Sequence, residues 1–136
     1  MKTVERWHSD RMRQPITLAR WGHDGVPVLV LPTAGGDAEE VERHKLVRVL
    51  GDLIDAGHLR LYSCDSVAGT AMMQGHGDVR YRCWLLNQFH QAVAREVVPA
   101  LQQDSGHELV TVAGSSIGAF NSVALLCRFP HLFRFA

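Results

Sequence analysis

The sequence lacks the features that would place it in several large classes of protein. No stretch of its 136 residues approaches the roughly 18 consecutive apolar residues that a membrane-spanning helix requires. Basic and acidic residues number 14 each, so no net charge attracts nucleic acid or an anionic membrane surface. The first residues contain no apolar segment typical of a secretion signal. We therefore expect a cytoplasmic protein that binds neither nucleic acid nor membrane.

Cysteine is scarce, and its spacing argues against two further kinds of site. Cys64, Cys83 and Cys127 are far apart and form no C-x-x-C pair, which disfavours a disulfide framework and a thiolate zinc site. We expect reduced thiols in apolar surroundings. The phosphate-binding patterns G-x-x-x-x-G-K-[ST] and G-x-G-x-x-G are also missing. The sequence gives no indication of a metal ion or another cofactor.

What the sequence does contain is an alternation of strand-like and helix-like segments. Two short stretches, 3–8 and 16–21, flank a polar turn and predict an antiparallel hairpin at a sheet edge. Three apolar runs predict buried parallel strands at 26–31, 59–64 and 109–113. A helix is expected after each run, and residues 132–136 resemble the start of another strand. This order predicts a single α/β domain over 1–136, with a mostly parallel sheet and right-handed crossovers.

The helical segments carry recognisable start and stop signals. Asp37 is expected to cap the first helix, with Glu40 completing a capping box three residues later. A long loop is expected from 65 to about 79. In the second helix, Pro99 should cause a kink or start a separate final turn, because proline removes one helical hydrogen bond. The third helix is expected over 119–128.

The segment Gly114-Ser115-Ser116-Ile117-Gly118 lies between the last apolar strand and the third helix. The pattern G-x-S-x-G in this position is typical of a nucleophile elbow, a sharp turn that exposes the serine hydroxyl above the sheet. Glycine is needed on both sides because a β-carbon there would clash with the neighbouring strand or helix. We therefore predict that Ser116 is a nucleophile. The alternative is an ordinary turn in which Ser115 or Ser116 caps the helix.

A serine nucleophile requires two donors for the oxyanion that forms on the substrate. The amide N–H of Ile117, which follows Ser116, is the expected first donor. The loop at 33–36, directly after the strand at 26–31, lies where the second donor belongs, and its two glycines permit a close backbone approach. An ordinary strand–helix connection would look the same, so the loop supports the elbow without establishing it.

A serine also requires a base, because its hydroxyl is scarcely ionised near neutral pH. Among eight histidines, His76 is the one candidate expected at the same end of the sheet as Ser116, with Asp78 beside it. His90 belongs to a predicted helix, where a solvated or internally hydrogen-bonded histidine is the usual case. We leave the acid and the base of a triad unassigned, with His76 as the candidate on this chain.

Four stretches together resemble the esterases of the α/β-hydrolase fold, in the esterase D-like group that includes relatives of S-formylglutathione hydrolase. They are VLVLPTAGG at 28–36, YSCDS at 62–66, EVVP at 96–99, and GSSIGAF at 114–120 with a trailing Phe-Pro at 129–130. The resemblance implies an α/β-hydrolase-like fold and a small-molecule carboxylic ester or thioester as substrate. It also implies Ser116 as nucleophile, with oxyanion donors from Ile117 and from Ala34 or Gly35.

In that family the acid and the histidine of the triad follow the nucleophile, after later strands. The resemblance covers only the first part of the family's domain, so we expect a domain truncated after the elbow helix, with an exposed sheet edge. The first hypothesis is a serine esterase that acts through an acyl-enzyme and is inactive or impaired as this chain. The second is a non-catalytic remnant or interaction module that pairs with another chain, or forms an oligomer, through the open edge.

Overall fold

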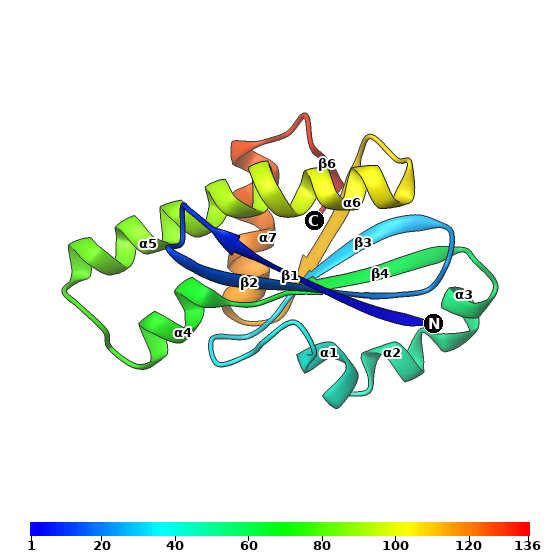
Figure 1. Ribbon diagram of the computed structural model, residues 1–136, viewed down its shortest axis with the longest axis horizontal. Helices are drawn as coiled ribbons and strands as arrows, with labels where there is room; N and C mark the ends of the chain where they lie inside the picture. The colour runs from blue at the N-terminus through cyan, green and yellow to red at the C-terminus, as the bar shows by residue number, and fades with distance from the viewer.

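The computed structural model describes all 136 residues and contains one six-stranded sheet with helices on both faces (Figure 1). The first two strands form an antiparallel hairpin, the second is antiparallel to its other neighbour, and the remaining neighbours are parallel. The order across the sheet is β1-β2-β4-β3-β5-β6. The strands are β1 (Lys2–Ser9), β2 (Gln14–Trp21), β3 (Val26–Leu31), β4 (Leu59–Cys64), β5 (Val110–Gly114) and β6 (Phe133–Phe135). The predicted α/β sheet with an N-terminal hairpin is confirmed.

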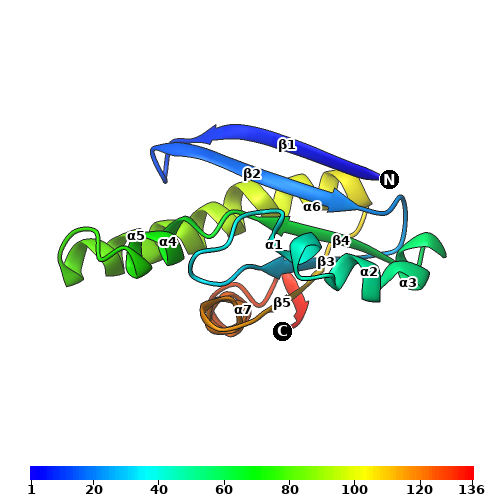
Figure 2. The ribbon, with the colours of Figure 1, turned by 90° about the horizontal axis from the view of Figure 1, so that it is seen from below.

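The helices divide between the two faces of this sheet (Figures 1 and 2). One face is covered by a long, nearly continuous helix and by the last helix: α5 (Val79–Ala92), a π-helical turn η1 (Val93–Val97), α6 (Val98–Ser105) and α7 (Ile117–Arg128). Three short helices cover the other face: α1 (Glu40–Arg43), α2 (Leu46–Val49) and α3 (Gly51–Asp55). A seventh helix, α4 (Val67–Met73), follows β4. No helix combines the length and the apolar character needed to cross a membrane.

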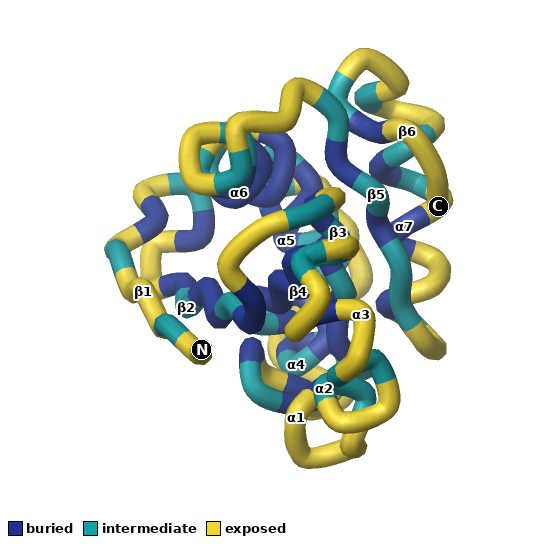
Figure 3. Tube along the Cα trace, turned by 90° about the vertical axis from the view of Figure 1, so that its right-hand side faces the viewer, coloured by how far each residue is buried: buried dark blue, intermediate teal, exposed yellow.

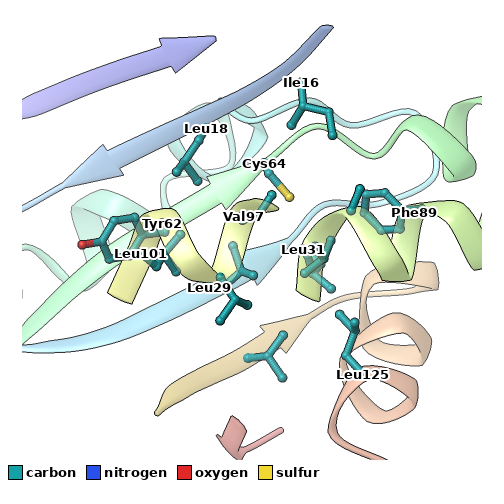
Figure 4. Packing of buried hydrophobic residues seen from close by; sticks show 14 of the residues in the cluster. Ile16, Leu18, Leu29, Leu31, Tyr62, Cys64, Phe89, Val97, Leu101 and Leu125 are labelled. Carbon is teal, nitrogen blue, oxygen red and sulfur yellow. The ribbon is translucent and has the colours of Figure 1, made fainter. Parts of the chain in front are cut away.

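The core forms because the central strands are apolar on both faces. Side chains alternate along a strand, so Leu29 and Leu31 of β3 point into the cluster under the long helix, while Val28 and Val30 pack on the opposite cluster. Figure 4 shows Leu29 and Leu31 among the side chains of that helix, and Figure 3 shows buried backbone concentrated in the central strands. Each fully buried leucine contributes about 1.5–3 kcal/mol. The sheet is thus a rigid base for the loops at its ends.

The helices depart from the sequence prediction in two places. The single helix expected to begin after Asp37 is divided into α1, α2 and α3: Lys45, with a left-handed φ of 65°, separates α1 from α2, and Leu50 separates α2 from α3. Its predicted capping box is wrong: Asp37 accepts a hydrogen bond from the Glu39 N–H within a turn, and no side chain caps α1. The long loop expected over 65–79 is also wrong in part, since it contains α4. Gly69 lets this helix approach the loop after β3, because a β-carbon there would lie 3.0 Å from Ala34 Cα.

Pro99 has the effect expected of it. The chain continues as one long helix, but α6 begins at Val98 after the widened turn η1, which removes the crowding that a proline ring causes in the preceding turn. This turn carries Glu96, whose carboxylate accepts hydrogen bonds from Trp7 Nε1 at 3.1 Å and from Arg11 at 3.0 Å. Through Glu96, the π-helical turn η1 therefore also connects the N-terminal hairpin to the long helix.

The three cysteines form no disulfide, but only Cys64 is buried. Burial raises the pKa of its thiol to about 12, which makes it an inert core side chain. Cys83 and Cys127 are exposed on α5 and α7, so the expectation of apolar surroundings for all three thiols is wrong.

Candidate active site

Ser116 lies at the sharp turn between β5 and α7, in a conformation that non-glycine residues rarely adopt. Its φ is 57° and its ψ is −126°, and the residue is exposed. Such a conformation costs of order 1–3 kcal/mol and persists only where its surroundings impose it. Ser116 occupies the N-cap position of α7, yet no side chain makes a capping hydrogen bond there. The alternative in which a serine caps this helix is therefore wrong.

The two flanking glycines are required for close contact, as the sequence predicts. A β-carbon on Gly114 would lie 2.8 Å from Gly118 Cα and closer still to the Gly118 carbonyl group. A β-carbon on Gly118 would lie 2.8 Å from the Pro32 carbonyl oxygen and overlap that of Leu31. Both obstacles are backbone atoms that cannot rotate away. The start of α7 therefore packs directly against the end of β5 and against the end of β3.

This contact brings the loop after β3 to the same end of the sheet as Ser116. Leu31 pairs with Gly114 in the parallel register, so the 33–36 loop starts beside the elbow. The N–H groups of Ala34, Gly35 and Ile117 donate no hydrogen bond within the protein. The amino end of α7 adds positive potential near Ile117. The arrangement offers unpaired donors next to an exposed hydroxyl, which is the chemistry that an oxyanion requires.

Two carboxylates that the sequence did not identify as site residues hold this loop. Glu40 accepts hydrogen bonds from the Thr33 N–H at 2.8 Å and from the Thr33 hydroxyl. Asp65, directly after β4, accepts hydrogen bonds from the Ala38 N–H at 3.1 Å and from the Thr17 N–H at 2.8 Å. A polar residue at the end of a buried strand could have identified Asp65 from sequence. No comparable signal existed for Glu40, because its spacing from Asp37 already suggested a capping role.

His76 is not brought to Ser116. It is exposed beyond the end of α4 and lines a cleft of about 490 Å³ together with Gly35, but Ser116 does not line that cleft. Asp78 does not pair with His76 either: its carboxylate accepts a hydrogen bond from the Tyr81 N–H at 2.7 Å and caps α5. No side chain makes a hydrogen bond to the Ser116 hydroxyl. The donors for an oxyanion and the candidate base are therefore separate features of this structure.

His90 is a buried histidine that is satisfied by neighbouring side chains, as expected for a helix position. Its Nδ1 lies 2.8 Å from an Arg128 nitrogen, which can only donate, so Nε2 carries the proton and donates to Asn121 Oδ1 at 2.8 Å. Burial lowers the pKa of His90, and the Arg128 charge acts in the same direction against the hydrogen bond to Asn121. These contacts join α5 to α7, the helix that begins at the elbow.

No protein-family model matches this chain, and no curated protein matches it in sequence. Solved structures do match it across 97–98% of its length. Enterobactin esterase FES from Shigella flexneri is 19% identical with a TM-score of 0.66, and an IroE-like serine hydrolase from Shewanella oneidensis is 13% identical with a TM-score of 0.69. A ferulic acid esterase is 15% identical with a TM-score of 0.66.

The chain spans only part of these proteins: 34% of the enterobactin esterase, 48% of the IroE-like hydrolase and 57% of the ferulic acid esterase. At such low identity the similarity concerns the arrangement of strands and helices, not the chemistry. The predicted α/β-hydrolase-like fold is confirmed.

Proposed function

We propose that this chain carries the nucleophile and the oxyanion-binding groups of a serine esterase. In the proposed reaction, Ser116 Oγ attacks the carbonyl carbon of a carboxylic ester or thioester. The proton of the hydroxyl passes to a base, and the alcohol or thiol leaves with a proton. Water then hydrolyses the resulting acyl-enzyme, which releases the acid and restores the serine. The observation that carries this proposal is the strained, exposed Ser116 between two glycines that admit no β-carbon.

The neighbouring donors support the same chemistry. The unpaired N–H groups of Ile117, Ala34 and Gly35 are the proposed ligands of the negatively charged oxygen in the tetrahedral intermediate. The solved structures with the same fold include enzymes named enterobactin esterase and ferulic acid esterase. A small-molecule ester is therefore the substrate class that we propose for this site.

Turnover by the chain alone should be slow. No histidine makes a hydrogen bond to the Ser116 hydroxyl, and the groups of a catalytic triad act as a unit, so a serine without its base retains little activity. A diffusible base should restore part of the missing function because Ser116 is exposed. A positioned general base contributes roughly 10²–10⁴-fold, and imidazole in solution can supply a fraction of that.

Hydrolysis of p-nitrophenyl acetate in the presence of imidazole tests the proposal. After subtraction of the reaction of imidazole itself, the wild-type chain should hydrolyse the ester at least about tenfold faster than Ser116→Ala. Equal rates would refute the esterase proposal. Efficient turnover without imidazole that Ser116→Ala abolishes would instead identify an internal base, with His76 as the first candidate.

A second candidate function is an interaction module that uses the open sheet edge. Strand β6 has only three residues and forms one edge of the sheet. Phe135 of this strand is 63% exposed, and on α7, which contacts β6, Phe120 and Val123 are each 57% exposed. Apolar side chains beside an unpaired strand favour pairing with another chain. Sedimentation analysis distinguishes the outcomes: a discrete dimer that Phe135→Lys dissociates would favour this function, and a stable monomer would argue against it.

A further inference from the structure

The 33–36 loop is a tight turn in which the two end residues use their backbone N–H groups and the two middle residues do not. The Gly36 N–H donates to the Thr33 carbonyl oxygen at 3.0 Å, which closes the turn. The Thr33 N–H donates to Glu40, and the Ala38 N–H donates to Asp65. The middle residues of the turn, Ala34 and Gly35, have N–H groups that donate to nothing. Fixing the ends of this turn therefore fixes the direction of its free donors.

Glu40 is in an unusual environment for a residue with only a structural role. It is 8% exposed, it forms no ion pair, and its carboxylate is bound by both donors of Thr33. The carboxylate lies so close to Gly36 that a β-carbon there would be 2.6 Å from its atoms. Burying a charge without a cation costs stability that an apolar side chain would not lose. What the carboxylate provides is a fixed position for both ends of the turn, Thr33 and Gly36.

We propose that Glu40 is a positioning residue for the oxyanion hole. Its carboxylate holds Thr33 by two hydrogen bonds and lies against Gly36, and it thereby keeps the Ala34 and Gly35 N–H groups directed toward the elbow. On the other side of the turn, the position of a Gly35 β-carbon would lie 2.9 Å from Met73 Cε, so α4 supports the loop there. The catalytic meaning of this contact rests on the proposed function of Ser116, whereas the ordering of the loop does not.

Imidazole-assisted hydrolysis of p-nitrophenyl acetate separates positioning from a general structural role. Removing one oxyanion donor lowers kcat by about 10²–10³-fold in serine hydrolases, so a loosened donor in Glu40→Ala should lower kcat at least about tenfold with KM nearly unchanged. Glu40→Gln should recover most of that loss, because its amide can accept from the Thr33 N–H and donate to the Thr33 hydroxyl. Gly36→Ala should reproduce the loss, because the new β-carbon displaces the Glu40 carboxylate.

The matched control is Glu39→Ala, which removes the adjacent carboxylate. Glu39 is partly exposed and pairs with Lys2 at 2.9 Å, so its loss should leave kcat and KM unchanged. Each variant is compared with the wild-type chain by circular dichroism to establish that it is folded. Equal kcat values for folded Glu40→Ala and the wild-type chain would overturn the proposal.

A second measurement keeps the proposal testable if the wild-type chain has no activity that depends on Ser116. Backbone ¹⁵N relaxation should give order parameters for Ala34 and Gly35 near those of a rigid backbone, about 0.85, in the wild-type chain. In Glu40→Ala these values should fall toward about 0.6 or below. Unchanged order parameters would refute the positioning role whatever the chemistry of Ser116, and lowered values without activity would refute only the esterase proposal.

Discussion

The loops after β3 and β5 are held by close contacts, whereas the segment after β4 includes an exposed stretch around His76, although all three begin at the carboxyl end of the parallel strands. At Gly114 and Gly118 the backbone lies directly against other backbone atoms, and the buried Glu40 carboxylate holds the 33–36 turn. The segment after β4 carries His76 on an exposed stretch, and Ser116 does not line the cleft that His76 lines. The loops after β3 and β5 contain the exposed Ser116 hydroxyl and free N–H donors, and the segment after β4 contains the exposed imidazole of His76.

This difference bears on the two kinds of chemistry that the proposed esterase reaction needs. Stabilising a developing negative charge requires donors that are fixed before the reaction begins, and in the proposed function these are the free N–H groups of the loops after β3 and β5. Proton transfer requires a base within hydrogen-bonding distance of the hydroxyl, and no side chain of this chain lies there. Under the proposed function, the groups for electrostatic stabilisation are thus present, whereas no group is positioned for general base catalysis.

The largest expected effect comes from breaking the rigid side of the comparison. Gly118→Ala introduces a β-carbon against the Leu31 and Pro32 carbonyl oxygens, so it should destabilise the chain by about 3 kcal/mol or more. Gly51→Ala is the matched control, because nothing lies within 4 Å of its β-carbon position. It should leave stability unchanged or raise it by up to about 1 kcal/mol. Urea unfolding measures both; a change below about 1 kcal/mol for Gly118→Ala would contradict the packing described here.

A smaller, pH-dependent effect should come from His90, which docks α5 on the elbow helix. Burial lowers the pKa of this histidine in the folded state, so the unfolded chain binds the proton more readily. The contribution of neutral, buried His90 to the free energy of unfolding is therefore fully present above the unfolded pKa of 6.5. It is lost as the pH falls below that value, and the free energy of unfolding then changes by at most about 1.4 kcal/mol per pH unit. Unfolding free energies measured at several pH values from 7.5 to 5 test this.

His90→Gln provides the comparison for that experiment. The variant removes the titrating ring between Asn121 and Arg128, so its stability should depend less on pH over this range than that of the wild-type chain. Parallel curves for the two proteins would show that His90 does not sense the difference between the folded and unfolded states.

The smallest expected effect concerns the exposed side of the comparison. His76→Ala should change the imidazole-assisted, Ser116-dependent rate by less than about twofold, because His76 lines a cleft that Ser116 does not line. Without imidazole the residual rate should be unchanged as well. A loss of about 100-fold would mean that the segment after β4 closes on the elbow and that His76 is the base.

Much of the fold was predictable because the relevant signals are local. The apolar run of β3 was predicted with its observed bounds, Val26–Leu31, and the G-x-S-x-G pattern identified the turn whose strain the structure reveals at Ser116. Both are set by residues adjacent in sequence. The parallel order followed from strand–helix alternation, since each crossover returns the chain to the same end of the sheet.

The rest depended on contacts between distant segments. The division of the first helix at Lys45 is not signalled by helix propensity, which favours continuation there. Helix α4 consists largely of small residues and was mistaken for a loop; its place depends on Gly69 fitting against Ala34. The pairing of His90 with Asn121 joins residues 31 apart on two helices, and no local pattern predicts it. Glu40 matched a capping pattern, but in the structure its carboxylate accepts a hydrogen bond from the Thr33 N–H and no side chain caps α1.

The central claim is that Ser116 is a nucleophile held beside preformed oxyanion donors and lacking a base. Mass spectrometry of the chain after brief exposure to p-nitrophenyl acetate and imidazole at neutral pH, followed by acid quenching and peptide mapping, tests it directly. We predict an acetyl group on Ser116, formed much faster with imidazole than without it and missing in Ser116→Ala. Acetylation distributed over lysines and other serines, with none preferred at Ser116, would contradict the account.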